Sequence, residues 1–118
     1  MAIKQEEWEG FTVVYGTSAR ENDRISTELA EPHDFWFHAA GFAGTHVIVR
    51  NPERLADLPK SVEKHAAELA VLHSKAKNAR GKIEVHQAWA KDVRKPPNFP
   101  PGKVLLSTYK TVKVYSPA

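Results

Sequence analysis

The chain of 118 residues has no cysteine, a single methionine and no long apolar run. Without cysteine it can form no disulfide, thiolate nucleophile or thiolate-bound zinc, so only histidines and carboxylates remain for a metal site. Residues 1–10 lack the apolar core of a secretory signal, and no apolar run approaches the roughly 20 residues that cross a bilayer. We therefore expect a cytoplasmic protein with no membrane partner.

The composition is typical of an ordinary globular protein, with 42% hydrophobic and 26% charged residues. Its length suits one hydrophobic core, so we expect a single domain over residues 1–118. The charge is uneven. Residues 1–58 hold five Lys and Arg against ten Asp and Glu, whereas residues 59–118 hold twelve against four, a net charge of +8. This asymmetry favours either a polyanionic partner or a solubilising lysine-rich surface.

The sequence predicts six strands and two helices. A β-branched and aromatic strand is expected at 11–15, and a helix at 19–30 follows a capping box formed by Ser18 and Glu21. Apolar residues at helical spacing predict a second helix at 61–77. The remaining strands are expected at 35–38, 45–50, 82–90, 104–107 and 111–115. The order β-α-β-β-α-β-β-β predicts an α+β fold with a mixed or mainly antiparallel sheet.

The stretch DFWFHAAGFAGTHVIVR, residues 34–50, is unusually rich in aromatic and histidine residues. Alternation along the first strand places Trp36 and His38 on the same face. If the two strands pair antiparallel, His38 and His46 both lie beside the Ala/Gly-rich turn that joins them. The two histidines are therefore candidates for a site.

A metal site would draw on the four residues His33, Asp34, His38 and His46. Their spacing matches neither the H-E-x-x-H helix nor another compact ligand motif. We therefore expect no metal and no cofactor.

A hydrolytic site would use His38 or His46 as the base and Ser74 as a nucleophile. No G-x-S-x-G surrounds that serine, and the chain has neither a P-loop nor G-x-G-x-x-G. No catalytic residue is assigned, but an RNA-processing or hydrolytic enzyme that uses His38 and His46 remains an alternative. A module that docks onto a ribosomal protein is a second alternative.

An RNA-binding surface needs positive charge, hydrogen-bond donors and planar groups for stacking. The sequence offers each of them, with Trp36 or Trp89 as the stacking group, although a tryptophan is more often a core residue. The hypothesis that follows is RNA binding by a surface made of Arg20, Asn22, Trp36, Lys75, Lys77 and Lys95, to which the family motifs below add His38 and His46.

Several motifs also occur in a specific order. They are G-x₅-N-D at 16–23, D-x-W-F-H at 34–38, G-T-H-V at 44–47, A-A…S-K at 66–75, V-x-K-P at 93–96 and P-G-x-V at 101–104. In these motifs the chain resembles the NFACT-R family, the C-terminal domain of NFACT proteins. These include bacterial fibronectin-binding-protein-A-like factors and the eukaryotic nuclear export mediator factor. The resemblance runs from about Phe11 to Val114.

The resemblance implies an α+β domain that binds structured RNA, tRNA or rRNA, in ribosome-associated quality control or RNA modification. Full-length NFACT proteins belong to machinery that recognises stalled large ribosomal subunits, which makes the large subunit an expected partner. Their other domains do not fit in 118 residues, so only the RNA-facing role is expected here. Two positions depart from the family pattern. Thr45 stands where serine is frequent, and Pro100 stands where a basic residue often precedes Pro-Gly.

Overall fold

The computed structural model describes residues 3–118 and has the α+β architecture that the sequence predicts. Six strands form one sheet in the order β1-β2-β4-β3-β5-β8, and every neighbouring pair is antiparallel. These strands are β1 (Lys4–Trp8), β2 (Phe11–Tyr15), β3 (Phe35–Ala39), β4 (Val47–Val49), β5 (Lys82–Trp89) and β8 (Lys110–Tyr115). Two short strands, β6 (Val93–Arg94) and β7 (Leu105–Leu106), pair separately.

Two helical segments accompany the sheet. The first, α1 (Ala19–Arg24), continues as a π-helical stretch η1 (Ile25–Leu29), so the helix predicted at 19–30 is confirmed. Its start is fixed as expected, because the Ser18 hydroxyl accepts a hydrogen bond from the Glu21 amide. The second helix, α2 (Lys60–Leu72), is followed after β5 by a short 3₁₀ turn, η2 (Ala90–Asp92).

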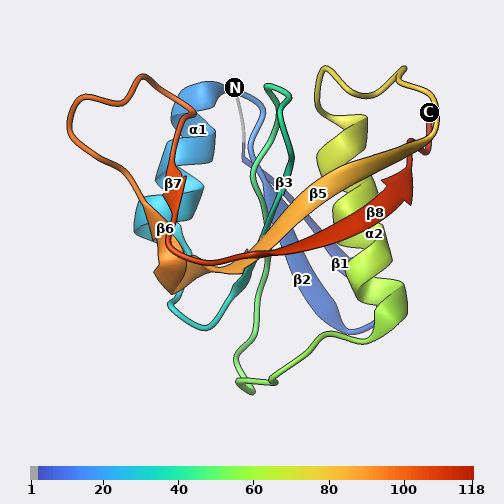
Figure 1. Cartoon of the computed structure of the whole chain (residues 1–118). Coiled ribbons are helices and arrows are strands. Elements are labelled where there is room, and N and C mark those ends of the chain that lie inside the picture. Colours follow the sequence, from blue (N-terminus) through green and yellow to red (C-terminus); the bar gives the residue numbers. More distant parts are fainter. Residues whose placement is uncertain (1–2) are drawn as a thin grey trace.

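The sheet is covered on both faces (Figure 1). On one face α2 packs against Phe35, Phe37 and the alternate residues of neighbouring strands. On the other face lie α1, η1 and the β6–β7 pair, where Ile25 contacts Trp36 and Ile48. The alternation predicted for residues 35–38 is thus confirmed. Because both faces are covered, the central strands β3 and β4 are almost entirely buried.

Two strands lie outside the predicted elements, and one predicted helix ends earlier than expected. The strand β1 was not predicted, because KQEEW is an edge strand whose polar side chains mostly face solvent. It joins β2 through a tight turn at Glu9 and Gly10, both with positive φ, and Glu-Gly is a weak turn signal. Strand β6 is only two residues long and was also missed. The second helix ends at Leu72 rather than at residue 77, because the chain after it pairs with the turn that follows β3.

Candidate functional site

The turn after β3 is held against the end of α2 by main-chain contacts. The Lys75 amide donates to the Ala43 carbonyl over 2.9 Å, and Gly44 forms an isolated antiparallel bridge with Ser74. A Cβ atom on Gly44 would lie 2.4 Å from the Ser74 Cβ, so the contact requires glycine. The bridge directs the chain away from helical geometry, which explains why α2 stops before residue 77. Two separate family motifs meet in this contact.

Asn22 joins the start of α1 to the same turn. Its Oδ1 accepts from the His46 amide over 3.1 Å, and its Nδ2 donates to the Gly44 carbonyl over 3.2 Å. A Cβ on Gly16 would lie 2.3 Å from that Oδ1, which accounts for the glycine of the G-x₅-N-D motif. Asn22 is only 5% exposed. Its side chain therefore holds the turn within the protein, and the RNA contact that the sequence suggested for it stays a prediction.

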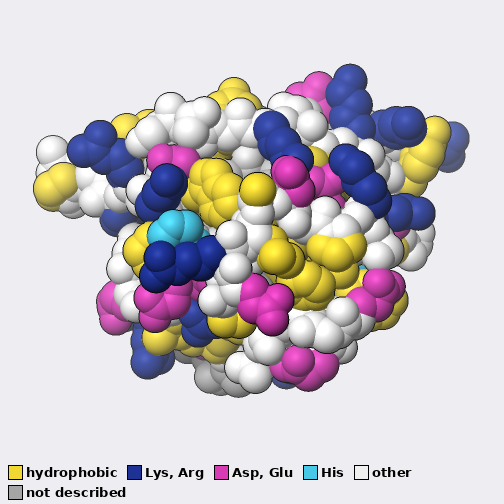
Figure 2. Space-filling view, turned by 90° about the horizontal axis from the view of Figure 1, so that it is seen from below, with side chains coloured by type: hydrophobic (Ala, Val, Ile, Leu, Met, Phe, Trp, Pro, Cys, Tyr) yellow, Lys and Arg dark blue, Asp and Glu magenta, His cyan; other side chains and the backbone are white. Residues whose placement is uncertain are grey.

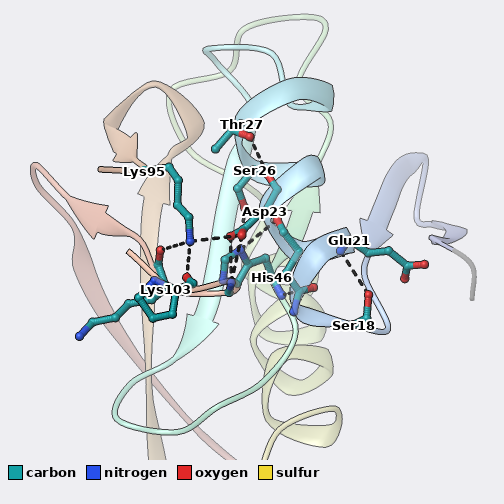
Figure 3. A network of polar contacts seen from close by, with 11 residues as sticks. Ser18, Glu21, Asp23, Ser26, Thr27, His46, Lys95 and Lys103 are labelled. Atoms are coloured by element: carbon teal, nitrogen blue, oxygen red, sulfur yellow. Dashed lines mark hydrogen bonds and ion pairs between the residues drawn. The ribbon is translucent and has the colours of Figure 1, made fainter. Parts of the chain in front are cut away.

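His46 and Trp36 share one buried serine. The Trp36 indole Nε1 donates to the Ser26 hydroxyl over 2.8 Å, and that hydroxyl lies 2.7 Å from Nδ1 of His46. Figure 3 shows the Ser26–His46 contact beneath the helix. Both rings are 1% exposed, so neither can stack on or hydrogen-bond to RNA in this structure. In this structure both rings thus have a structural role, and the RNA contact expected of them stays a prediction.

The two histidines lie together, as the antiparallel pairing predicted. The rings of His38 and His46 meet edge to face, with 5.2 Å between their centroids. Burial lowers the pKa of His38 to about 4, helped by the charge of neighbouring His86. Burial also lowers the pKa of His46 to about 4, helped by His38. Both imidazoles are therefore neutral near pH 7, and only His38 reaches a cavity. This geometry does not supply an accessible histidine pair for hydrolysis.

Lys95 is occupied by the protein itself. Its ammonium lies 3.2 Å from a carboxylate oxygen of Asp23 and donates to the carbonyls of Pro100 and Lys103. The Gly102 amide adds hydrogen bonds of 3.1 Å to both oxygens of the same carboxylate. Figure 3 shows Lys95 reaching across from the 95–103 loop to α1. We call these contacts the loop clamp. Lys95 is thus a clamp residue in this structure, and the RNA contact expected of it stays a prediction.

Between the turn, α1 and the clamped loop lies an open cleft of about 1100 Å³. Of the expected RNA contacts, His38 and Lys77 line it with polar side chains, and Asn22 and Trp36 contribute to its wall. Arg20 and Lys75 are exposed but lie outside the lining. The sequence did not single out four further lining residues: Phe42, His86, Lys103 and Tyr109.

For two of these four residues, the sequence did contain a feature that could have indicated a place in the site. Lys103 lies within P-G-x-V and Tyr109 directly precedes the last strand, both in segments that carry the family resemblance. Nothing in the sequence indicated that β5 would place His86 beside them, since its register against β3 is a tertiary property.

The charge of the cleft differs from that of the rest of the surface. No Asp or Glu of residues 3–118 lines it, whereas two lysines and three histidines do. Neither Lys77 nor Lys103 forms an ion pair with any described residue. In contrast, Figure 2 shows acidic and basic side chains intermixed around apolar patches on the face seen from below. The cleft is therefore suited to an anion.

The described chain offers neither a metal site nor a membrane span. Within residues 3–118, no group of three or more His, Asp or Glu side chains is placed to hold a metal ion. No helix of this part of the chain is long and apolar enough to cross a membrane.

Comparison with known proteins agrees with these motifs. A family model described as "NFACT protein RNA binding domain" matches residues 2–108. The chain belongs to this family. Among curated relatives, this NFACT RNA-binding domain is 32% identical over 102 residues to the "Rqc2 homolog RqcH" of Streptococcus suis (strain 05ZYH33). It is also 32% identical over 105 residues to the protein of the same name from Bacillus subtilis (strain 168).

The similarity covers most of this chain but a small part of those relatives. The two alignments span 86% and 89% of the domain, and only 18% of each relative. A solved structure, the C-terminal part of the fibronectin/fibrinogen-binding protein from Streptococcus suis, superimposes with a TM-score of 0.84 at 29% identity. That match covers 95% of this chain and 44% of the other. The structural similarity therefore extends over nearly all of this chain.

Proposed function

We propose that this NFACT RNA-binding domain holds RNA in the cleft, with Lys77 and Lys103 contacting phosphates. The observation that carries the proposal is the absence of carboxylates from the lining, although the chain has 14 acidic residues and all of them are described. A lining that combines lysines outside any ion pair with planar rings has the features by which proteins bind RNA, and the Lys103 ammonium also lies 5.3 Å from the centroid of the Phe99 ring. Arg20 and Lys75, exposed on flanking segments, extend the basic surface to neighbouring phosphates.

The remaining residues expected to bind RNA take supporting parts in this proposal. Asn22, Trp36 and His46 hold the turn and α1 in place, and Lys95 holds the loop that carries Lys103. His38 remains a proposed contact because it lines the cleft.

We further propose that the RNA is structured, tRNA or rRNA, and that the domain acts in ribosome-associated quality control or RNA modification. Support comes from the family resemblance and from two relatives that bear the name Rqc2 homolog RqcH. The large ribosomal subunit and a cytoplasmic setting form part of the same proposal. Because the chain spans 18% of those relatives, no activity of their other regions is proposed for it.

The test is the affinity for tRNA and a ribosomal RNA fragment, measured by fluorescence anisotropy at several salt concentrations. The double variant Lys77→Glu/Lys103→Glu should bind much more weakly. The slope of log K against log salt should fall by about 0.9 for each phosphate that the variant no longer neutralises. The matched control is Lys64→Glu/Lys82→Glu, which changes charge equally at exposed positions outside the cleft. Equally weakened binding by both double variants would show that the effect is one of net charge and would remove the cleft from the proposal.

A further inference from the structure

Four of the rings that line the cleft lie in a row, which runs from the buried Trp36 to the exposed Tyr109. Trp36 and His38 lie on β3, with ring centroids 5.9 Å apart. His38 is paired directly with His86 of β5, which places the two side chains next to each other on one face of the sheet. His86 in turn packs against Tyr109 in a tilted arrangement, with 4.1 Å between ring centroids and 35° between the ring planes.

The outer end of this row is open to solvent. Tyr109 is 51% exposed, and Phe42, on the turn at another side of the cleft, is 37% exposed. Exposure alone does not mark a ligand site, because single exposed apolar residues are normal on a protein surface. These two rings line a cavity whose volume of about 1100 Å³ is at or above the roughly 300–1,000 Å³ of typical small-ligand sites. The open end is thus large enough for a planar ligand.

We propose that an unpaired RNA base stacks on the Tyr109–His86 pair and that Phe42 borders it. This inference rests on the function proposed above and adds the class of RNA: a nucleotide outside a duplex, in a loop, bulge or single-stranded end. Three features favour such a base over an apolar peptide. The platform consists of flat rings, two unpaired lysines lie in the same lining, and no carboxylate is present to bind a basic peptide.

A base within a duplex cannot use this platform. Its two faces are already covered by neighbouring base pairs, so only unstacked bases can lie against an aromatic side chain. The burial of His38 keeps its pKa near 4, so the imidazole beside the platform is neutral near pH 7. Recognition at this point is therefore expected to depend on stacking, whereas the lysines supply attraction to the backbone.

The experiment compares three labelled RNAs of equal length: an unstructured single strand, a blunt duplex and a hairpin with an unpaired loop. The single strand and the hairpin should bind more tightly than the duplex. Tyr109→Ala should weaken binding of the single strand roughly 5- to 150-fold, the range measured for removal of one stacking partner. The salt slope should stay unchanged, because the lysines still neutralise the same phosphates. Phe42→Ala should act in the same direction, and Tyr109→Phe should retain binding.

Tyr115→Ala is the matched control, since Tyr115 is 62% exposed at the end of β8 and lies outside the cleft. Equal binding by Tyr109→Ala and Tyr115→Ala would overturn the stacking site. So would a duplex that binds as tightly as the single strand; in both cases lysine-dependent RNA binding would survive. If the wild-type domain bound none of the three RNAs, the proposed function itself would fail, and this inference with it.

Discussion

At the scale of single residues, the family motifs build a scaffold. The Thr45 hydroxyl illustrates this, because it accepts from the Gly16 amide over 3.1 Å and donates to the Gly16 carbonyl over 2.7 Å. Buried main-chain groups left without partners cost about 1–3 kcal/mol each, so this hydroxyl is hard to replace. Threonine in place of the family's frequent serine keeps the bond. A match to a family motif therefore does not by itself show that a residue contacts a ligand.

The buried histidines predict a dependence of stability on pH. A histidine in the unfolded chain titrates near pH 6.5, whereas the pKa values of His38 and His46 are about 4 in the folded protein. Between these values the unfolded chain binds more protons than the native protein, so stability is full above pH 6.5 and falls as the pH drops towards 4. The expected decrease is on the order of 1–3 kcal/mol for each histidine.

Urea unfolding at pH 7.5, 6.5, 5.5 and 4.5 measures this decrease. His38→Gln, at a partly exposed position, should fold and should show a shallower decrease in the free energy of unfolding than the wild type. Contributions from carboxylates are common to both proteins and cancel in the comparison. Parallel pH profiles for the two proteins would mean that His38 does not carry the effect.

At the scale of elements, the loop clamp decides where one side of the cleft lies. Asp23 on α1 binds both the Lys95 ammonium and the Gly102 amide, although these residues are far apart in sequence from the helix. The three charged or polar partners come from the N-D, V-x-K-P and P-G-x-V motifs. The clamp thereby positions Lys103, which lies next to Gly102 and is among the residues that line the cleft. The irregular segment is therefore held by specific polar contacts rather than by regular secondary structure.

Removing the clamp should free this loop without unfolding the sheet. Lys95→Met breaks the charged contacts while keeping most of the apolar stem. Hydrogen exchange at the Gly102 amide should accelerate by at least roughly tenfold, since a charge-assisted hydrogen bond contributes about 1.5–3 kcal/mol. Amides of β3 should exchange as in the wild type. Lys103→Met is the control within the same loop, and an equal acceleration in both variants would argue against the clamp.

Sequence patterns predicted the elements well where residues close together in the sequence determine the structure. Residues 11–15 form the predicted strand, and Ser18 with Glu21 begins the predicted helix. The end of α2 could not be read from helical periodicity, because the bridge between Gly44 and Ser74 joins segments that are far apart in the sequence. The same holds for the site. Motif positions indicated where polar contacts concentrate, but burial decided that Trp36 and His46 are internal and that Tyr109 is exposed.

At the scale of the whole molecule, the uneven distribution of charge along the sequence is only partly reflected in the distribution of charge over the surface. Residues 59–118 carry a net charge of +8, yet the face seen in Figure 2 carries acidic and basic side chains intermixed. Lys60 and Lys110 pair with Glu63, and Lys95 pairs with Asp23, so these cations are partly neutralised within the fold. Net charge alone therefore does not define the RNA surface. What distinguishes the cleft is the combination of unpaired lysines with the absence of carboxylates.

This distribution predicts which lysines RNA will cover. In acetylation of lysines by an amine-reactive reagent, followed by mass spectrometry, bound RNA should lower the reactivity of Lys77 and Lys103 several-fold. Lys64 and Lys113 are exposed outside the cleft lining and should react equally with and without RNA. Lys95 should react slowly in both states, because its ammonium is held by Asp23. Uniform protection of all exposed lysines would instead indicate diffuse electrostatic association, which would contradict a localised interface even if the RNA affinity were high.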